Sequence, residues 1–442
     1  MQCVSTFLCI LHSMNIEQLY DYFLTGRKVS TDSRNITTGC LFFALKGENF
    51  NGNAFAFEAI EKGALAAVVD EDPIRQHPGI IKVDHVLTAL QQLSRFHRLR
   101  MGIPVLAITG SNGKTTTKEL CKAVLAEKFK VYATEGNLNN HIGVPLTLLS
   151  MNDTIEFGIV EMGANHPGEI ALLCDIAQPD FGLITNVGKA HLEGFVNVQG
   201  VAQAKGEMFK HLMQRGKTLF VNEGNNQVRQ LVSGNYIHAV WYNGSKGPKI
   251  QSMTGDPFLN LQIAYGDQRI EIQTALLGGY NAENVLGAYS VGIHLGVPAE
   301  SIKRAIQDYR PENNRSQLLY TGKNKIFMDA YNANPSSMRA AIMEFLQFND
   351  QKKLLILGEM RELGDSSARE HENIVALLKE KVIIDVIFVG EAFKKPAGKA
   401  GYKFAESADQ LRAWLSATPL TGHFIFMKGS RSNKLETLIP SL

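Results

Sequence analysis

The feature that most constrains the fold is a glycine-containing stretch, residues 107–117, with the sequence Ala-Ile-Thr-Gly-Ser-Asn-Gly-Lys-Thr-Thr-Thr. The apolar residues 103–108 predict a short buried strand before it, and apolar positions at helical spacing in residues 116–129 predict a helix after it. Glycines at such a turn leave backbone N–H groups free to bind a phosphate, which the helix N-terminus also favours. The stretch is therefore predicted to be a phosphate-binding loop.

The polar residues of this loop have predicted roles of their own. Lys114 supplies a cation for the phosphate, and the Thr115 hydroxyl is a ligand for Mg²⁺. The loop is shorter than the usual GxxxxGK[ST] motif, because only Ser111 and Asn112 separate the first glycine from Gly113. The alternative is an ordinary strand-to-helix turn with a chance lysine, but Gly-Lys-Thr stands where phosphate binding requires it. The predicted phosphate-binding residues are Thr109, Gly110, Ser111, Asn112, Gly113, Lys114, Thr115 and Thr116.

Length and composition restrict the class of protein. A chain of 442 residues is too long for one core and predicts two to four domains. A net charge of +2 argues against a nucleic-acid binder that works through bulk charge. The five cysteines form no CxxC pair, so neither a disulfide framework nor a zinc site is indicated. Without a membrane-length apolar run, and with residues 1–13 a poor match to a signal peptide, we expect a cytoplasmic protein that does not insert into membranes.

Alternating strand and helix patterns predict an α/β fold of three domains. Residues 1–98 are predicted to form a small N-terminal module, in which the strand-like run 39–45 is followed by a polar glycine turn at 46–52. Residues 99–310 predict a doubly wound, mostly parallel sheet around the phosphate loop. Residues 311–442 predict a second open, Rossmann-like α/β sheet.

Three residues of the central domain are candidates for chemistry. Glu161 ends the predicted strand 155–161, so it either binds Mg²⁺ beside the phosphate loop or caps a helix or forms a structural ion pair. His191 lies in a loop after the predicted strand 181–186, where most histidines are surface groups. Lys205 lies in a helix among small and apolar residues, where most lysines are solvated but partial burial would lower the pKa.

Polar clusters also follow the predicted strands of the outer domains. In the third domain they occupy residues 329–335, 358–364 and 428–431. Each cluster could serve turns and helix caps, but three at strand ends favour a binding edge. In the first domain, Ser, Arg and Lys near the loops would suit a phosphorylated ligand, although a solvated loop with a structural arginine explains that segment equally well.

Taken together, these motifs resemble the ATP-dependent Mur ligases of bacterial peptidoglycan synthesis, from about residue 14 to 440. The short phosphate loop is the form that this family has. The resemblance is greatest to the members that join D-alanyl-D-alanine to UDP-N-acetylmuramoyl-tripeptide. The motifs that carry it are residues 109–117, 136–145, 161–165, 186–191, 204–207 and 329–336.

The resemblance implies ATP and two Mg²⁺ ions as cofactors, and it implies a set of catalytic residues. Lys114 matches the cation on the γ-phosphate. Thr115, Glu161 and His191 match Mg²⁺ ligands. Lys205 matches a lysine that the family carries as a carbamate, N6-carboxylysine, which would hold the second ion.

The resemblance also implies binding residues for the nucleotide and the substrates. Asn284 corresponds to an adenine-side asparagine, Arg315 to a phosphate-contacting arginine, and Asp329 to a ribose or hinge contact. Tyr280 stands where relatives often have histidine. The residues implied to bind the UDP-sugar peptide and the dipeptide are Ser30, Asp32, Ser33, Arg34, Lys46, Gly47, Asn139, Asn140, Tyr331, Asn332, Asn334 and Ser336.

The implied reaction converts a peptide carboxylate to an acyl phosphate, which the amine of D-alanyl-D-alanine then attacks. Acyl phosphates hydrolyse, so we expect the third domain to close over the central one. We also expect a monomer without a nucleic-acid partner. The alternatives are the relative that adds the diamino acid at the third peptide position, whose Asp-x-Pro-Arg motif is absent here, a folate polyglutamylating ligase, and a nucleotide-dependent switch protein without activity.

Overall fold

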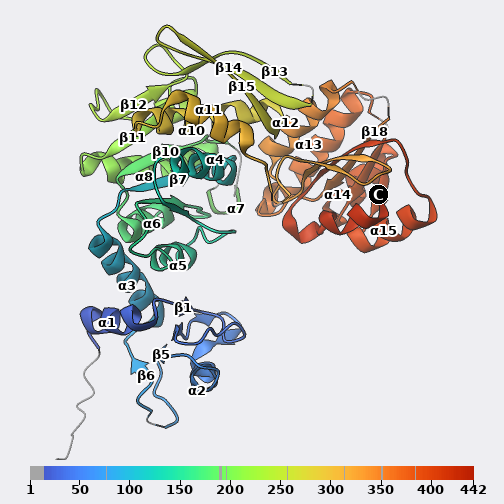
Figure 1. The fold of residues 1–442 in the computed structure, drawn as a ribbon. Coiled ribbons are helices and arrows are strands. Elements are labelled where there is room, and N and C mark those ends of the chain that lie inside the picture. Colours follow the sequence, from blue (N-terminus) through green and yellow to red (C-terminus); the bar gives the residue numbers. More distant parts are fainter. Residues whose placement is uncertain are drawn as a thin grey trace, which may run out of the picture.

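The chain folds into three α/β units that follow one another along the sequence (Figure 1). In this computed structural model the first unit is blue, the central unit runs from teal to yellow, and the third is orange and red. The expected three-domain α/β architecture is confirmed. The structure describes residues 14–75, 77–188, 192–195, 197–255, 257–312, 314–349, 352–383 and 385–442.

The first unit is a small parallel sheet in the order β1-β2-β5-β6. The predicted turn at 46–52 is different: residues 46–51 form a short antiparallel hairpin, and a 3₁₀ turn, Gly52–Phe55, follows it. Asn51 begins that turn because its side chain accepts a hydrogen bond from Asn53 N at 3.1 Å. The elements are α1 (Ile16–Gly26), β1 (Val29–Ser30), β2 (Leu41–Phe43), β3 (Lys46–Gly47), β4 (Phe50–Asn51), α2 (Ala56–Glu61), β5 (Ala66–Val69) and β6 (Ile80–Lys82).

A single helix, α3 (Val86–Met101), connects the first unit to the central one. It begins beside the first sheet, runs past the predicted boundary at residue 98 and ends just before the first strand of the central sheet. Near its C-terminus the buried Arg98 donates to Ala177 O at 3.0 Å and forms an ion pair with Asp180 at 2.8 Å. The helix therefore belongs to both units.

The central unit contains a six-stranded parallel sheet in the order β12-β11-β10-β7-β9-β8 among the described residues, as the alternating pattern predicted. Helices cover both of its faces. The strands are β7 (Val105–Thr109), β8 (Val131–Ala133), β9 (Phe157–Glu161), β10 (Phe181–Ile184), β11 (Thr218–Asn222) and β12 (Ala239–Tyr242). The helices are α4 (Lys114–Ala126), α5 (Gly143–Leu149), α6 (Glu169–Ala177), α7 (Leu192–Phe195), α8 (Val198–Gln214), α9 (Asn226–Arg229), α10 (Ala282–His294) and α11 (Ala299–Asp308).

A three-stranded antiparallel sheet extends the central unit toward the third, at the top of Figure 1. Its strands are β13 (Lys249–Gly255), β14 (Phe258–Tyr265) and β15 (Gln268–Leu277). The alternating patterns of residues 258–264 and 270–275 predict two strands, which are β14 and β15. Strand β13 was not predicted, because most of its side chains are exposed and its sequence carries no apolar period.

The third unit is a second six-stranded sheet of the described chain, in the order β16-β17-β21-β18-β19-β20. Its edge strand β16 is antiparallel and the others are parallel. The strands are β16 (Gln317–Tyr320), β17 (Lys325–Asp329), β18 (Lys353–Gly358), β19 (Val386–Val389), β20 (Lys403–Ala405) and β21 (Phe424–Lys428). The helices are α12 (Pro335–Gln347), α13 (Ser367–Glu380), α14 (Glu391–Ala400) and α15 (Ala408–Ala417).

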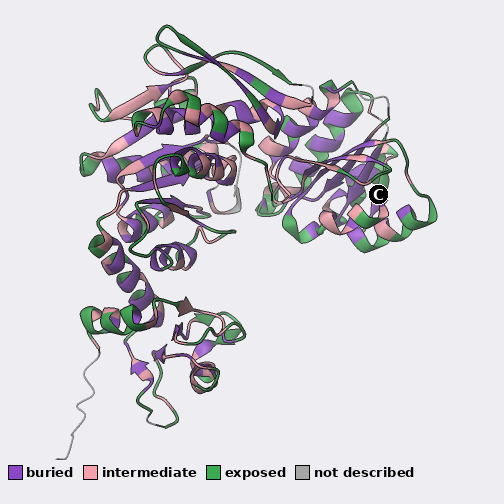
Figure 2. Cartoon of the chain, in the orientation of Figure 1, coloured by how far each residue is buried: buried purple, intermediate pink, exposed green. Residues whose placement is uncertain are grey.

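Burial explains why the strands of the two large sheets have apolar sequences. Their inner strands are purple in Figure 2, whereas green covers the outer faces of the helices. Each of these sheets is packed on both faces against a hydrophobic cluster. A parallel strand buried on both faces needs a continuous apolar run, so polar groups are displaced to the strand ends. Among the described helices, none has the length and apolar character needed to cross a membrane.

Candidate active site

The phosphate loop lies between β7 and α4, as predicted. Gly110 has φ 151° and Gly113 has φ 77°, which L side chains rarely adopt. A Cβ at Gly110 would lie 1.9 Å from Thr185 Oγ1, and one at Gly113 would lie 2.3 Å from Asn284 Oδ1. Both glycines are therefore required by backbone conformation and by close packing.

Hydrogen bonds from neighbouring strand ends hold this loop in place. Asn112 N donates to Asn186 Oδ1 at 3.0 Å, and the Asn186 amide returns a bond to Asn112 O at 3.0 Å. Ser111 Oγ lies 3.1 Å from Gly188 O and also accepts from Gly188 N at 2.9 Å. Thr109 Oγ1 donates to Met162 O at 2.7 Å. The loop is thus fixed before any ligand binds.

Lys114, the first residue of α4, turns back over the loop. Its Nζ donates to Gly110 O at 2.7 Å. Desolvation lowers the pKa of Lys114, and the nearby Glu161 carboxylate opposes this change. The ammonium therefore contacts the loop backbone, and Lys114 lines the same cavity as Ser111 and Gly113 of the loop.

Glu161 is buried at the end of β9 and bonded through both carboxylate oxygens. Oε2 accepts from Thr115 Oγ1 at 2.8 Å, and Oε1 accepts from Asn139 Nδ2 at 2.9 Å. A hydroxyl beside a carboxylate is a donor set that suits Mg²⁺. Thr115 and Glu161 therefore fit the predicted ion, although the described residues contain no cluster of three His, Cys, Asp or Glu that could hold a metal.

The two asparagines predicted to bind substrate make contacts within the protein. Asn139 donates to Glu161, as above. Asn140 Oδ1 accepts from Ile142 N at 3.1 Å and from Gly143 N at 2.9 Å, at the start of α5. Asn139 therefore orients a candidate metal ligand, and the Asn140 oxygen supports a helix.

Lys205 is completely buried in α8, and its Nζ has no hydrogen-bond partner among the described residues. The Phe195 ring centroid lies 5.7 Å from Nζ. Desolvation, with a smaller contribution from the Lys114 charge, lowers the pKa of Lys205 to about 7. An amine with this pKa is about half unprotonated at pH 7, and its neutral form is nucleophilic, so it fits the reaction with CO₂ that a carbamate requires.

His191, the remaining predicted Mg²⁺ ligand, lies outside the described residues. Its role stays a prediction.

The predicted adenine-side residue Asn284 is buried near the N-terminus of α10 and close to the loop. Its Oδ1 accepts from Thr117 Oγ1 at 3.1 Å, and its Nδ2 donates to Asn281 Oδ1 at 2.9 Å. Tyr280 lies two residues before α10 begins, and its hydroxyl is 3.2 Å from Ser316 Oγ of the third unit. The residue that departs from the family pattern therefore contacts the junction between the two units.

The third unit contributes a mixed charged and aromatic wall. The Arg315 guanidinium stacks 3.7 Å from the centroid of the Tyr331 ring. Lys428 Nζ contacts Asp329 Oδ2 at 2.5 Å and donates to Asn332 O at 3.3 Å. Asp329 ends β17 and Lys428 ends the neighbouring β21, where the polar clusters predicted a binding edge, whereas Arg315 precedes the edge strand β16.

A cavity of about 1470 Å³ separates the central and third units and brings most predicted residues together. Thr109, Gly110 and the buried Lys205 do not line it. The wall also includes residues that were not predicted as sites, among them Gln251 and Met253 of β13, which belong to no recognisable sequence motif. The predicted residues that line the cavity are Ser111, Asn112, Gly113, Lys114, Thr115, Thr116, Asn139, Asn140, Glu161, Asn284, Arg315, Asp329, Tyr331, Asn332, Asn334 and Ser336.

Of the described residues, none from the first unit lines this cavity. The predicted residues there form a separate group. The Arg34 guanidinium contacts both Asp32 oxygens at 2.9 Å and lowers the pKa of Asp32 to about 2. Ser30 Oγ donates to Asp32 O at 3.1 Å, and Ser33 O accepts from Lys62 at 3.0 Å. An ionised Asp32 and a largely exposed arginine thus stand at the end of β1.

Comparison with known proteins identifies the family. Residues 27–98 match the Mur ligase family catalytic domain, residues 108–292 the Mur ligase middle domain, and residues 314–431 the Mur ligase glutamate ligase domain. The chain belongs to the Mur ligase family, whose members are ATP-dependent peptide ligases.

The curated relatives narrow the comparison further. UDP-N-acetylmuramoyl-tripeptide--D-alanyl-D-alanine ligase of Bacillus subtilis is 34% identical over 94% of this chain and 92% of its own length. The enzyme of the same name from Escherichia coli is 33% identical over 95% of this chain and 94% of its own length.

Solved structures agree with this similarity. MurF from Acinetobacter baumannii is 30% identical with a TM-score of 0.85, over 93% of this chain and 92% of that chain. MurF ligase from Thermotoga maritima, crystallised with ADP, is 25% identical with a TM-score of 0.83, over 95% of this chain and 98% of that chain.

Proposed function

We propose that this protein joins D-alanyl-D-alanine to the peptide carboxylate of UDP-N-acetylmuramoyl-tripeptide, with conversion of ATP to ADP and phosphate. The observation that carries the proposal is the cavity in which Lys114 and the Thr115–Glu161 pair face polar residues of the third unit. Relatives that bear the name of this activity align with more than nine tenths of the chain.

In the first step, a peptide carboxylate oxygen attacks the γ-phosphorus of ATP, and ADP leaves. Lys114 and the loop N–H groups stabilise charge on the transferring phosphoryl group. Mg²⁺ would supply positive charge that offsets the negative charge of the phosphates. Thr115 and Glu161 would hold one ion, with His191, and the carbamate of Lys205 would hold a second.

In the second step, the dipeptide amine attacks the acyl carbon and loses a proton, and the tetrahedral intermediate collapses with release of phosphate. Water would destroy the acyl phosphate, so the cavity must close. We assign Asn284, Arg315 and Asp329 to the nucleotide, and Tyr331, Asn332, Asn334 and Ser336 to the nucleotide and dipeptide region. Solution scattering with an ATP analogue and the UDP-tripeptide should report smaller dimensions than the free protein.

Each of the three units is proposed to bind a different part of the reactants. We assign the UDP-sugar to residues 1–98, ATP to residues 99–310, and the dipeptide with part of the nucleotide to residues 311–442. We further propose a cytoplasmic monomer that contributes to cell-wall synthesis and so to cell shape and division.

The decisive experiment measures phosphate release with ATP, Mg²⁺ and purified UDP-muramoyl peptides. D-Alanyl-D-alanine is added to the UDP-tripeptide in one reaction, and a free diamino acid is added to the UDP-dipeptide in the other. Turnover that depends on D-alanyl-D-alanine is the expected result. Turnover with the diamino acid instead would assign the chain to the related ligase that adds the third peptide residue.

A further inference from the structure

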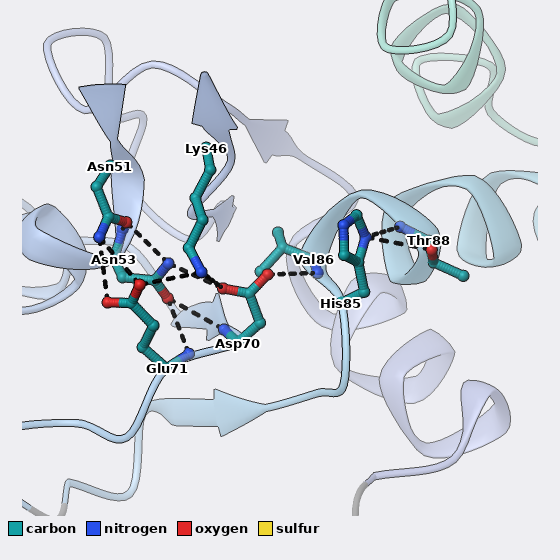
Figure 3. A network of polar contacts seen from close by, with 8 residues as sticks. All are labelled: Lys46, Asn51, Asn53, Asp70, Glu71, His85, Val86 and Thr88. Carbon is teal, nitrogen blue, oxygen red and sulfur yellow. Dashed lines mark hydrogen bonds and ion pairs between the residues drawn. The ribbon is translucent and has the colours of Figure 1, made fainter. Parts of the chain in front are cut away.

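Lys46 of the first unit is already paired with acidic side chains of its own chain. Its Nζ lies 3.0 Å from Asp70 Oδ1 and 3.0 Å from Glu71 Oε1, as Figure 3 shows. Two carboxylates around one ammonium leave this cluster with a net charge of −1. A diphosphate that approached the Lys46 side chain would therefore meet a negative site rather than an available cation.

Two asparagines complete the cluster by donating hydrogen bonds to the carboxylate oxygens of Asp70 and Glu71. Asn51 Nδ2 donates to both Glu71 oxygens at 3.1 Å. Asn53 Nδ2 donates to Asp70 Oδ1 at 2.9 Å, and Asn53 Oδ1 accepts from Asp70 N at 3.0 Å. A polar network satisfied to this degree holds its members in one geometry.

The network links three elements that are separate in the sequence. Lys46 and Asn51 are the paired ends of the β3–β4 hairpin, and Asp70 directly follows β5. The second oxygen of Asp70 accepts from Val86 N, the first residue of α3, at 3.2 Å. A hairpin with so few paired residues is not stable by itself, so its position depends on these contacts together with the stacking of Phe50 on Phe55.

The hairpin stands at the edge of the sheet where ligands of parallel sheets bind. It follows the carboxyl end of β2, and the Asp32–Arg34 loop follows the carboxyl end of the neighbouring β1. Gly47, beside Lys46, has an exposed backbone, and a Cβ built there meets no described atom within 4 Å. Packing does not require glycine at this position, whereas close approach of a ligand to the backbone would.

We propose that Lys46 is a positioning residue, which fixes the β3–β4 hairpin so that the backbone at Gly47, and not the Lys46 ammonium, contacts the UDP part of the substrate. This inference rests on the proposed function. It differs from the interpretation of Lys46 as a substrate-binding cation. The two interpretations predict opposite changes in the Kd for the UDP-tripeptide when the neighbouring Glu71 carboxylate is removed.

The test compares Lys46→Met, Glu71→Gln and the double variant by calorimetric titration with UDP-N-acetylmuramoyl-tripeptide in the absence of ATP. Both single variants should raise the Kd by roughly three- to tenfold, because each removes the same anchor. The double variant should bind no worse than the weaker single variant. If Lys46 contacted the diphosphate directly, Glu71→Gln would remove a repelling charge and lower the Kd, and that result overturns the proposal.

Two further variants separate an effect on binding of the UDP-tripeptide from a loss of folding. Gly47→Ala should weaken UDP-tripeptide binding while the melting temperature and the KM for ATP stay unchanged, and unchanged affinity would contradict the assigned contact. Lys82→Met removes the lysine of an exposed pair with Asp72 in the same unit and should bind as the wild type does. Failure of the proposed function would appear separately, as absence of binding and turnover by the wild-type protein.

Discussion

Asn334 of the third unit donates its Nδ2 hydrogen to Oδ1 of Asn112 in the phosphate loop, at a distance of 2.6 Å. The same side chain caps α12, because its Oδ1 accepts from Ser337 N at 2.9 Å. Asn112 is fixed in turn by Asn186. This contact joins the start of α12 to the loop, so any separation of the two units must break it.

Replacing Asn334 with aspartate separates the two roles of this side chain. Asn334→Asp keeps an oxygen that caps α12 but loses the donor to Asn112 and places a carboxylate against an amide oxygen. We expect kcat to fall about tenfold, which corresponds to about 1.4 kcal/mol, with an unchanged melting temperature. Steady-state kinetics and thermal unfolding give both values.

Asn15→Asp is the matched control, because Asn15 caps α1 in the same way, with a 2.9 Å bond from Gln18 N. It should leave kcat and the melting temperature unchanged. A normal kcat for Asn334→Asp would mean that catalysis does not use the contact between the units.

Glu161→Gln should weaken the Mg²⁺ dependence of the reaction. The amide removes the charge of a candidate ligand while it keeps the size of the side chain. We expect the Mg²⁺ concentration at half-maximal phosphate release to rise roughly tenfold or more. Glu156→Gln, at the opposite end of the same strand region, should show no change, and an equal Mg²⁺ requirement in both variants would argue against Glu161 as a ligand.

Lys205→Ala should reduce turnover by roughly 100-fold or more, the scale of losing charge stabilisation by a metal ion. Acetate or formate should restore part of it by occupying the space of the carbamate. Phosphate release with and without these anions is the measurement. Lys210→Ala, an exposed position on the same helix, is the control, and wild-type turnover of Lys205→Ala would eliminate the carbamate.

The stability of the third unit should fall in mild acid because of His371. This buried ring accepts from Met360 N at 3.0 Å through Nε2, and its Nδ1 lies 2.7 Å from Ser367 O, so the neutral form is bonded on both sides. Burial lowers the pKa of His371 below its ordinary value near 6.5. Below that pH the unfolded chain binds the proton more readily, and stability decreases by up to about 1.4 kcal/mol per pH unit.

Hydrogen exchange of the β18 and α13 amides between pH 7 and 5 would report this loss. His371→Gln, whose side-chain oxygen replaces the acceptor for Met360 N, should give a flatter pH dependence. The exposed His238→Gln should behave as the wild type, and parallel curves for all three proteins would assign the acid sensitivity to other groups.

Much of the fold was predictable because its information is local. The strand predicted at 155–161 is β9, and the strand and helix around the phosphate loop lie within a few residues of their predicted bounds. Strands buried on both faces require continuous apolar runs, and a phosphate loop requires glycine at fixed spacing. These patterns can be recognised in the local sequence, without knowledge of which distant residues each residue contacts.

The remaining features depend on contacts that spacing does not encode. The hairpin at residues 46–51 was predicted as a turn, because its strands are held by Asp70 and Glu71 rather than by an apolar pattern. Nothing near Asn334 indicates that it reaches Asn112, and the isolation of the Lys205 amine follows only from what surrounds it. Contacts between residues that lie far apart in the sequence can be identified only from the three-dimensional structure.

Because helix α3 contacts both units, the number of residues in this helix sets the orientation of the first sheet relative to the central unit. Val86, at its start, is bonded to Asp70 of the first unit, and Gln91 already donates to His141 O of the central unit at 3.0 Å. One residue inserted between them would rotate everything upstream by about 100° and shift it by about 1.5 Å. Because Tyr20 and Phe23 of α1 pack against His97 of α3, even a whole-turn insertion would break contacts, so α3 should tolerate insertions far less than the loops do.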